Sequence, residues 1–299
     1  MDSMGTAPRI FDRLLLRARR SRAEKLGFES FLIERVAQDM AERLSVVLRR
    51  FDLAADIGTP SDAVRRGLID SKLVSRIVAV DPLARGGGLK VAADEEALPF
   101  RDGSLDLIVS ALALHAVNDL PGALVQARRA LKPDGLFLAA LLGGDTLVEL
   151  REAFAAAETE IEGGVSPRVA PFADLRDLGA LLQRAGFALP VADSERMTVR
   201  YATPFGLMAD LRRMGATNVL SERRRTPLRR QTLLRMAEIY AARFGDPDGK
   251  LRATFEVNWL SGWAPDASQQ KALRPGSART RLADALNTRE LPAGEKTAR

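Results

Sequence analysis

Four short apolar runs follow one another through the first half of the chain, with helical patterns between several of them. The runs are LAADI (53–57), RIVAVD (76–81), LDLIVSA (105–111) and GLFLAALL (135–142). Such short apolar runs are typical of strands that are buried on both faces. Strands that alternate with helices indicate a mostly parallel sheet with helices on either side. The sequence therefore predicts an α/β fold, a three-layer sandwich of the Rossmann-like kind.

Further elements flank these runs. Apolar residues at helical spacing predict two helices before the first strand, at 10–24 and 28–48. After the fourth run, helical spacing predicts four helices and alternation predicts two strands. These helices are expected at 145–161, 172–185, 204–214 and 227–243, and the strands at 189–200 and 253–260.

The chain is expected to divide into three parts. Residues 1–50 form an N-terminal helical extension, and 51–263 form the α/β domain with a helical insertion around 203–245. Residues 264–299 are polar, contain Gly and Pro and lack aromatic side chains, which predicts a flexible tail. A helix at 121–131 is predicted to end before LKPDG, a stop-and-turn signal.

The composition narrows the chemistry that is open to this chain. Its 299 residues include no cysteine and one histidine, His115. Disulfides, thiolate zinc sites and iron–sulfur clusters are excluded, as is any metal site with two imidazoles from one chain, and we expect no metal site. No apolar run approaches the length of a membrane span, and the N-terminus lacks the apolar stretch of a secretory signal. We expect a cytoplasmic protein, or a mitochondrial matrix protein in a eukaryote.

The net charge of +6 has two interpretations. It indicates either a basic surface for an acidic partner or membrane face, or a GC-rich coding bias, because most of the basic residues are arginine. Aromatic residues make up 5% of the chain, too few for stacking on bases, so we expect no specific nucleic-acid partner.

Acidic residues follow several of the predicted strands. In an open parallel sheet, ligands bind outside the carboxyl ends of the strands. Asp81 is placed to accept hydrogen bonds from a ribose diol, and Asp94 to receive the amine of adenine, with the backbone of Ala93 or Glu95 on the ring nitrogen. Each acid alone could merely cap a turn, but their common position indicates a nucleotide cofactor site.

These stretches, in this order, resemble the class I S-adenosylmethionine-dependent methyltransferases. The resemblance implies a seven-stranded sheet and S-adenosylmethionine as cofactor. The family motifs fall on Asp56-Ile57-Gly58-Thr59-Pro60-Ser61, on Asp81, on Asp94 and on Ser110–Asp119. The resemblance thus implies Asp56, Gly58 and Ser110 as further cofactor-binding residues.

The glycine-rich turn of that family is broken here. Thr59 and Pro60 follow Gly58 where glycines would let the backbone approach a ligand, and Pro60 also removes an N–H. Two interpretations stay open: the protein binds S-adenosylmethionine through Asp56, Gly58, Asp81 and Asp94, or the pocket is vestigial or adapted to another ligand.

A more specific resemblance covers nearly the whole chain. GGDTLVELR (143–151) and EGGVSPRVAPF (162–172) are similar to segments of the methyltransferase-fold assembly factors of respiratory complex I, the arginine-hydroxylase type. FDRLLLRARRSRA (11–23) and WLSGW (259–263) fit the same family. A more distant resemblance runs to the malonyl-carrier-protein O-methyltransferases.

Three functions follow as hypotheses. The first is modification of a protein arginine on a peripheral complex I subunit, although this chain shows no source for the oxidant that hydroxylation needs. The second is methyl transfer to a carrier-bound or small-molecule carboxylate, in which positioning supplies most of the catalysis. The third is a non-catalytic assembly scaffold.

Two sequence features suggest contacts with a substrate or partner. His115 follows the fourth strand, where it is either a packed histidine or a substrate-facing base or donor, since a histidine ordinarily titrates near neutral pH. The basic N-terminal helix is expected to offer a surface to a complex I subunit or a membrane face. Charge reversal at Arg17, Arg19 and Arg20 is therefore expected to leave the fold intact.

Overall fold

A computed structural model describes residues 9–83, 87–270, 276–277 and 280–289. Residues up to Pro265 form one compact unit. A second unit begins at Asp266, and its described part includes the short helix α9 (Leu282–Ala285). Most of the predicted flexible tail therefore falls in this second unit and partly outside the described residues.

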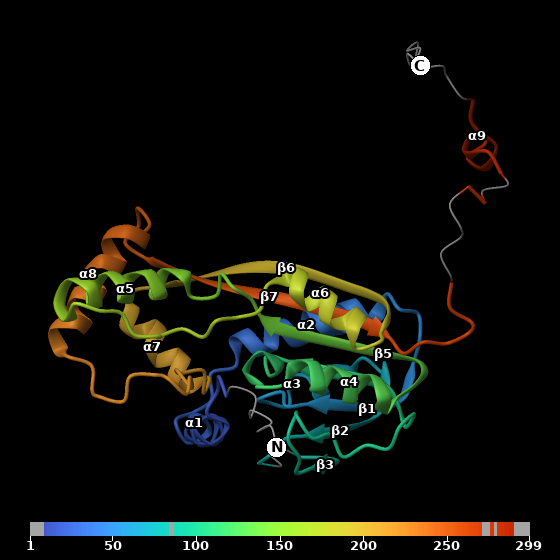
Figure 1. Cartoon of the computed structure of the whole chain (residues 1–299), viewed down its shortest axis with the longest axis horizontal. Coiled ribbons are helices and arrows are strands. Elements are labelled where there is room, and N and C mark those ends of the chain that lie inside the picture. Colours follow the sequence, from blue (N-terminus) through green and yellow to red (C-terminus); the bar gives the residue numbers. More distant parts are fainter. Residues whose placement is uncertain (1–8, 84–86, 271–275, 278–279, 290–299) are drawn as a thin grey trace, which may run out of the picture. The chain divides into compact units, whose positions relative to one another are not determined.

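The described residues of the first unit contain one seven-stranded sheet in the order β3-β2-β1-β4-β5-β7-β6 (Figure 1). Neighbouring strands among β1 to β5 pair in parallel, and β7 pairs antiparallel with both β5 and β6. This arrangement confirms the predicted mostly parallel seven-stranded sheet. The strands are β1 (Phe51–Ile57), β2 (Val74–Val80), β3 (Lys90–Val91), β4 (Leu105–Ala111), β5 (Leu131–Leu142), β6 (Ala188–Tyr201) and β7 (Leu251–Trp263).

Helices cover both faces of the sheet because the central strands are apolar on both sides. In β4, Leu107 and Val109 pack against α2 (Phe31–Ser45) and α3 (Ala63–Asp70). The intervening Ile108 joins the opposite core with α4 (Leu120–Ala130) and α6 (Leu175–Arg184). The alternation of side chains along one strand thus builds two cores, which confirms the predicted three-layer sandwich.

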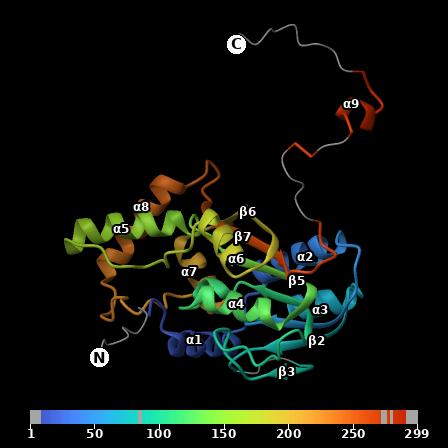
Figure 2. The same ribbon diagram turned by 45° about the vertical axis from the view of Figure 1, so that its right-hand side comes forward.

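A third apolar core lies where β6 and β7 extend beyond the other strands (Figures 1 and 2). It contains buried residues of α5 (Val148–Glu162), α7 (Pro204–Arg213) and α8 (Arg230–Phe244), packed against Leu251 and Phe255 of β7. In sequence, α7 and α8 lie between β6 and β7, where the helical insertion is expected.

The N-terminal helix α1 (Arg13–Lys25) is fixed to the sheet edge at its start. Asp12 caps it by accepting from the backbone N–H of Leu15 at 2.9 Å, and Phe11 forms an antiparallel bridge with Leu220. Phe11 is also bound in both directions by Asn118, whose Oδ1 accepts from the Phe11 N–H at 2.8 Å. The first turn of α1 is therefore tied to the loop that follows β4.

Two details differ from the sequence-based prediction. LKPDG was predicted to form a turn, but it is the first part of β5, which begins at Leu131. The pairing of β5 with β4 shifts register at this stretch. Asp134 there has a φ of 59°. The bounds of α3 and β3 also do not follow from the sequence pattern, because elements of eight and two residues are too short for a clear period. No helix in the described part of the chain is long and apolar enough to cross a membrane.

Candidate functional site

The expected cofactor residues gather at one edge of the sheet because their strands run in parallel. Asp56 is the next-to-last residue of β1, Asp81 follows β2, and Ser110 is the next-to-last residue of β4. The Ser110 hydroxyl donates to the Ile57 carbonyl at 2.7 Å. Asp81 is buried, and its Oδ1 accepts from the Leu83 N–H at 2.6 Å. Asp94 belongs to the loop after β3, next to the half-buried Ala93. These residues gather at the carboxyl ends of the parallel strands, as predicted. Their contacts there indicate what each of them can bind.

Asp56 is engaged by groups of the protein. Arg65 Nη1 donates to its Oδ2 at 2.7 Å, and the Thr59 hydroxyl donates to its Oδ1. Burial raises the pKa of Asp56 to about 6 despite Arg65 and Thr59, which lower it. The Thr59 Oγ1 in turn accepts from the Ala111 N–H at 3.0 Å. The threonine that follows Gly58 in the turn therefore ties β1 to β4.

Gly58 allows another group to lie close to the backbone of the turn, as a glycine of this motif does, but here that group is a side chain of the protein itself. Its φ of 70° lies in the left-handed region, which favours glycine. A Cβ at this position would collide with the carboxylate of Glu95. The side chain of Glu95 therefore occupies the space directly over the turn.

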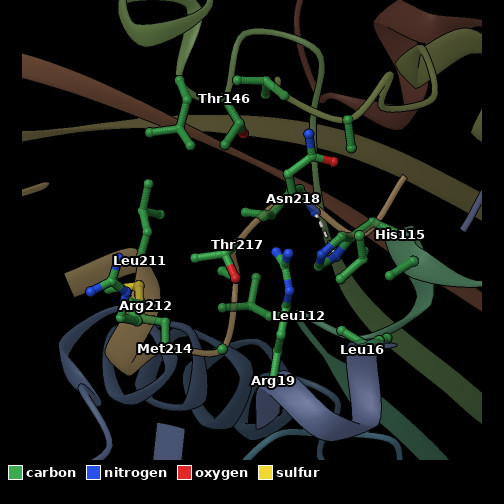
Figure 3. A pocket seen from close by; sticks show the side chains of 18 of the residues that line it. Leu16, Arg19, Leu112, His115, Thr146, Leu211, Arg212, Met214, Thr217 and Asn218 are labelled. Carbon is green, nitrogen blue, oxygen red and sulfur yellow. Dashed lines mark hydrogen bonds between the residues drawn. The ribbon is translucent and has the colours of Figure 1, made fainter. Parts of the chain in front are cut away.

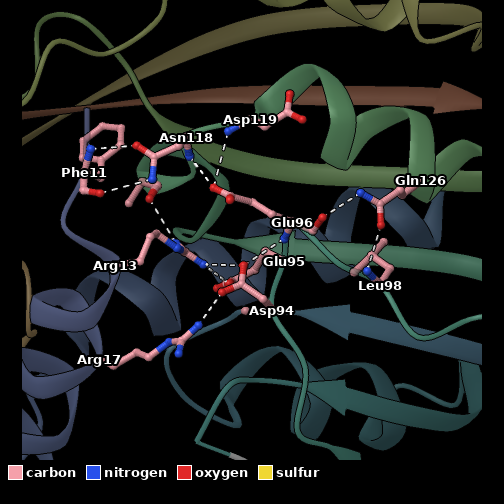
Figure 4. Close-up of polar contacts among 12 residues, drawn as sticks. Phe11, Arg13, Arg17, Asp94, Glu95, Glu96, Leu98, Asn118, Asp119 and Gln126 are labelled. Atoms are coloured by element: carbon pink, nitrogen blue, oxygen red, sulfur yellow. Dashed lines mark hydrogen bonds and ion pairs between the residues drawn. The ribbon is translucent and has the colours of Figure 1, made fainter. Parts of the chain in front are cut away.

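Arginines of α1 hold the Asp94–Glu95 pair from the other side (Figure 4). Arg13 Nη2 lies 3.0 Å from Asp94 Oδ1 and also contacts Glu95 Oε2, while Arg17 Nη2 lies 2.5 Å from Asp94 Oδ2. Burial raises the pKa of Asp94, but the backbone N–H of Glu96 and the two arginines outweigh it, so that the pKa is lowered.

Arg20 completes this group, which we call the α1–Glu95 cluster (Arg13, Arg17, Arg20, Asp94 and Glu95). Its Nη1 donates to the Gly58 carbonyl at 3.1 Å and lies 3.6 Å from Glu95 Oε1. The side chain of Glu95 is fully buried, and that of Arg20 is 8% exposed. The expectation of a basic helix face turned to a partner is therefore wrong for Arg13 and Arg20, which neutralise buried carboxylates.

The α1–Glu95 cluster occupies positions at which S-adenosylmethionine was expected to bind. The space over Gly58 is filled by Glu95, and both oxygens of the Asp94 carboxylate are bonded to arginines. Asp81, which follows β2 and was expected to bind a ribose diol, accepts from the Leu83 N–H through Oδ1. As a whole the residues do not fit the cofactor in this arrangement, because Glu95 lies over the turn and arginines bind Asp94, the acid that was expected to bind adenine.

A cavity of about 400 Å³ lies beside the cluster, between α1, α2, α7 and the ends of β4 and β5 (Figure 3). Most of its wall is apolar, with Leu16, Leu112 and Leu211 among the lining residues. Arg19 and His115 supply polar groups from α1 and from the short helix η1 (Leu114–Ala116).

The expectation that His115 titrates near neutral pH is corrected by its surroundings. Burial, together with the charge of Arg20, lowers its pKa to about 3. Its Nδ1 accepts from the Leu142 N–H at 3.5 Å, and its ring stands edge-on to Phe172 with centroids 5.6 Å apart. His115 is therefore a neutral ring that can donate from Nε2 but does not take up a proton at physiological pH.

Two glutamates hold the segments that contribute to the cavity wall at the two ends of α5. The backbone N–H of Asp145 donates to Glu256 at 2.8 Å, and Thr146 Oγ1 donates to the Glu256 carbonyl at 3.1 Å. The buried Glu158 accepts from the Ser166 N–H at 2.8 Å and from Arg168 Nε at 2.9 Å. These bonds fold segments 143–151 and 162–172 against the cavity.

The ion pairs between Glu95 and the α1 arginines were not predicted from the sequence. One signal was present: Arg13, Arg17 and Arg20 are spaced at i, i+4 and i+7, which places them on one face of a helix. Nothing local connects that face to Asp94, about 80 residues away in the chain. In the described ranges, no three His, Asp or Glu side chains come together as metal ligands would.

Comparison with known proteins agrees with this fold. A family model of the methyltransferase domain matches residues 56–139. The YcgJ protein of Bacillus subtilis superposes with a TM-score of 0.51 at 15% identity, over 77% of this chain and 99% of that one. Fold and sheet edge together define a protein of the class I methyltransferase fold.

Relatives of higher identity extend over nearly the whole chain. The mitochondrial arginine-hydroxylase NDUFAF5 of Homo sapiens is 38% identical over 98% of this chain and 89% of its own length. The malonyl-[acyl-carrier protein] O-methyltransferase of Halorhodospira halophila is 34% identical over 92% of this chain and 95% of its own. The chain belongs to the family of methyltransferase-fold proteins that includes the arginine-hydroxylase NDUFAF5.

Proposed function

We propose that this protein is an assembly factor of respiratory complex I that acts on a protein substrate, a peripheral subunit, as the resemblance to the arginine-hydroxylase type implies. The similarity to NDUFAF5, at 38% identity, covers 98% of the chain. It supports a shared role more strongly than similarity in one domain would. Those relatives are mitochondrial by name, which supports a mitochondrial location if the encoding organism is a eukaryote.

The observation that carries the proposal is the position of the two most specific segments. Residues 143–151 and 162–172 are far more particular to the assembly factors than the nucleotide motifs are. Both contribute to the cavity wall, through Thr146 in the first and Arg168 and Phe172 in the second. Two segments through which the chain resembles the assembly factors thus contribute to the wall of one cavity.

The proposal assigns no step to S-adenosylmethionine. The α1–Glu95 cluster occupies the positions that would hold the cofactor, so an assembly role is supported independently of methyl transfer. A role in modifying arginine is carried by the resemblance alone, and the oxidant of a hydroxylation has no counterpart among the residues described.

Deletion of the gene in the organism that encodes it tests the role in assembly. We expect less assembled complex I on a native gel and lower NADH oxidation by membranes, both restored by the wild-type gene. Normal complex I in the deletion strain would overturn the proposal.

The same strain separates a second candidate, methyl transfer to a carrier-bound carboxylate. The 34% identity with a malonyl-[acyl-carrier protein] O-methyltransferase over 92% of the chain favours it. That function predicts a growth requirement for biotin together with normal complex I. A strain with low complex I and no need for biotin would reject it.

A further inference from the structure

One cation in the cavity wall has no counter-ion among the residues that the structure describes. Arg19 projects from α1 into the cavity and is half-buried (Figure 3). Within the part of the chain that the structure describes, it forms no hydrogen bond and no ion pair. Burial and the charges of Arg223 and Arg22 lower the pKa of Arg19, whereas the charge of Asp12 raises it. Asp12 is itself paired with Arg223 at 3.3 Å. A half-buried guanidinium therefore faces an apolar space without compensation.

The other charged groups of the cavity are either paired or at the surface. Arg20 is held by Gly58 and Glu95, and Arg168 by Glu158. Glu29, the acid in the cavity wall, pairs with Arg213 at 3.0 Å. Arg212 is exposed. The uncompensated charge that points inward is thus positive.

His115 adds a neutral donor to this cation. Its low pKa keeps the ring uncharged, and because Nδ1 accepts from Leu142, the proton lies on Nε2. Arg19 and His115 line the same cavity from α1 and η1, which are far apart in sequence (Figure 3). Both are donors.

We infer that the cavity binds an apolar ligand that carries one carboxylate. A guanidinium binds a carboxylate through two parallel hydrogen bonds, and such charge-assisted bonds are strongest where water is excluded. A cationic ligand would instead place a second positive charge beside Arg19. A volume of about 400 Å³ lies within the range of small-molecule sites. This inference goes beyond the proposed function and does not depend on a role in complex I.

Calorimetric titration with three eight-carbon ligands tests the sign of the charge. We expect octanoate to bind at least about 10-fold more tightly than octanol or octylamine, the range expected of a hydrogen bond to a charged group. Arg19→Gln should abolish this preference. Arg22→Gln, an equal loss of charge at an exposed position of the same helix, should retain it. Equal affinity for the three ligands, no binding of octanoate, or an unchanged preference in Arg19→Gln would overturn the inference.

The single histidine locates the binding event. In tag-free protein the imidazole signals in an NMR spectrum come from His115 alone. Octanoate should shift them at saturation, and binding without any shift would place the ligand elsewhere and reject the cavity. Arg19→Lys keeps the charge and should recover part of the preference, which separates a loss of charge from a loss of folding. A lysine variant that folds and binds octanoate no better than octanol would also reject the inference.

Discussion

At the scale of single residues, His115 shows how burial changes the chemistry of a side chain. Its folded pKa of about 3 lies below the value of 6.5 for a free histidine. Between these values the unfolded chain binds the additional proton, so the contribution of His115 to the free energy of unfolding is complete above pH 6.5 and is lost as the pH falls toward 3. NMR titration should show a neutral ring from pH 5 to pH 8.

A matched variant checks the origin of this pH dependence. His115→Gln should unfold with a shallower dependence on pH between 3 and 6.5 than the wild type, measured as urea midpoints at several pH values. An imidazole that titrates near pH 6.5 in the folded protein would contradict the assignment.

Glu95 carries the second prediction at this scale. Glu95→Ala empties the space over Gly58 and removes the carboxylate that Arg13 and Arg20 contact there, so that their charges could face the carboxylate of S-adenosylmethionine instead. We expect this variant to bind S-adenosylmethionine more tightly than the wild type in calorimetric titration. Glu95→Gln keeps the volume and should bind as weakly as the wild type. If Glu95→Ala does not gain affinity, Glu95 is not what closes the turn.

At the scale of elements, α1 belongs to the folded domain and is not an appendage. Arg13→Ala leaves the carboxylate of Glu95 buried without its closest partner, and breaking a buried pair in this way costs about 3–5 kcal/mol. Urea unfolding should register that loss. Arg22→Ala, at an exposed position of α1, should change stability by less than about 0.5 kcal/mol.

The same contacts revise an expectation from the sequence. Reversing the charge of Arg17, Arg19 and Arg20 would place two of the new carboxylates beside Asp94 and Glu95. We now expect this triple variant to lose the packing of α1 and to unfold at lower urea. A triple variant as stable as the wild type would show that α1 does not depend on these pairs.

At the scale of the whole molecule, α5, α7 and α8 share one core with the extended ends of β6 and β7. We expect the unit up to Pro265 to unfold in one transition, with far-UV circular dichroism and the fluorescence of Trp259 and Trp263 changing together. Met236→Ala in α8, where the side chain is fully buried, should lower stability by about 2–5 kcal/mol. Leu234→Ala, at an exposed position of α8, is the control, and separate transitions for the two signals would contradict a shared core.

The sequence by itself determined the sheet and the edge at which the site lies. The runs at 53–57 and 105–111 are mostly apolar, and this local property is enough to predict that they form buried strands of a parallel sheet. The acids at the strand ends then fall at one edge because parallel strands all end there. This much depends on neighbours in sequence, which a pattern records.

The tertiary structure alone decided what those acids bind. Asp94 and Glu95 are paired by arginines about 80 residues away, and Thr59 receives its backbone partner from Ala111 in β4. The low pKa of His115 and the uncompensated charge of Arg19 depend equally on what is packed around them. Burial and ion pairing depend on which distant parts of the chain pack together, and a local pattern does not record this. The turn at Gly58 has lost glycines of its motif, and in the folded protein the space over it is filled by Glu95, which is paired with arginines of α1.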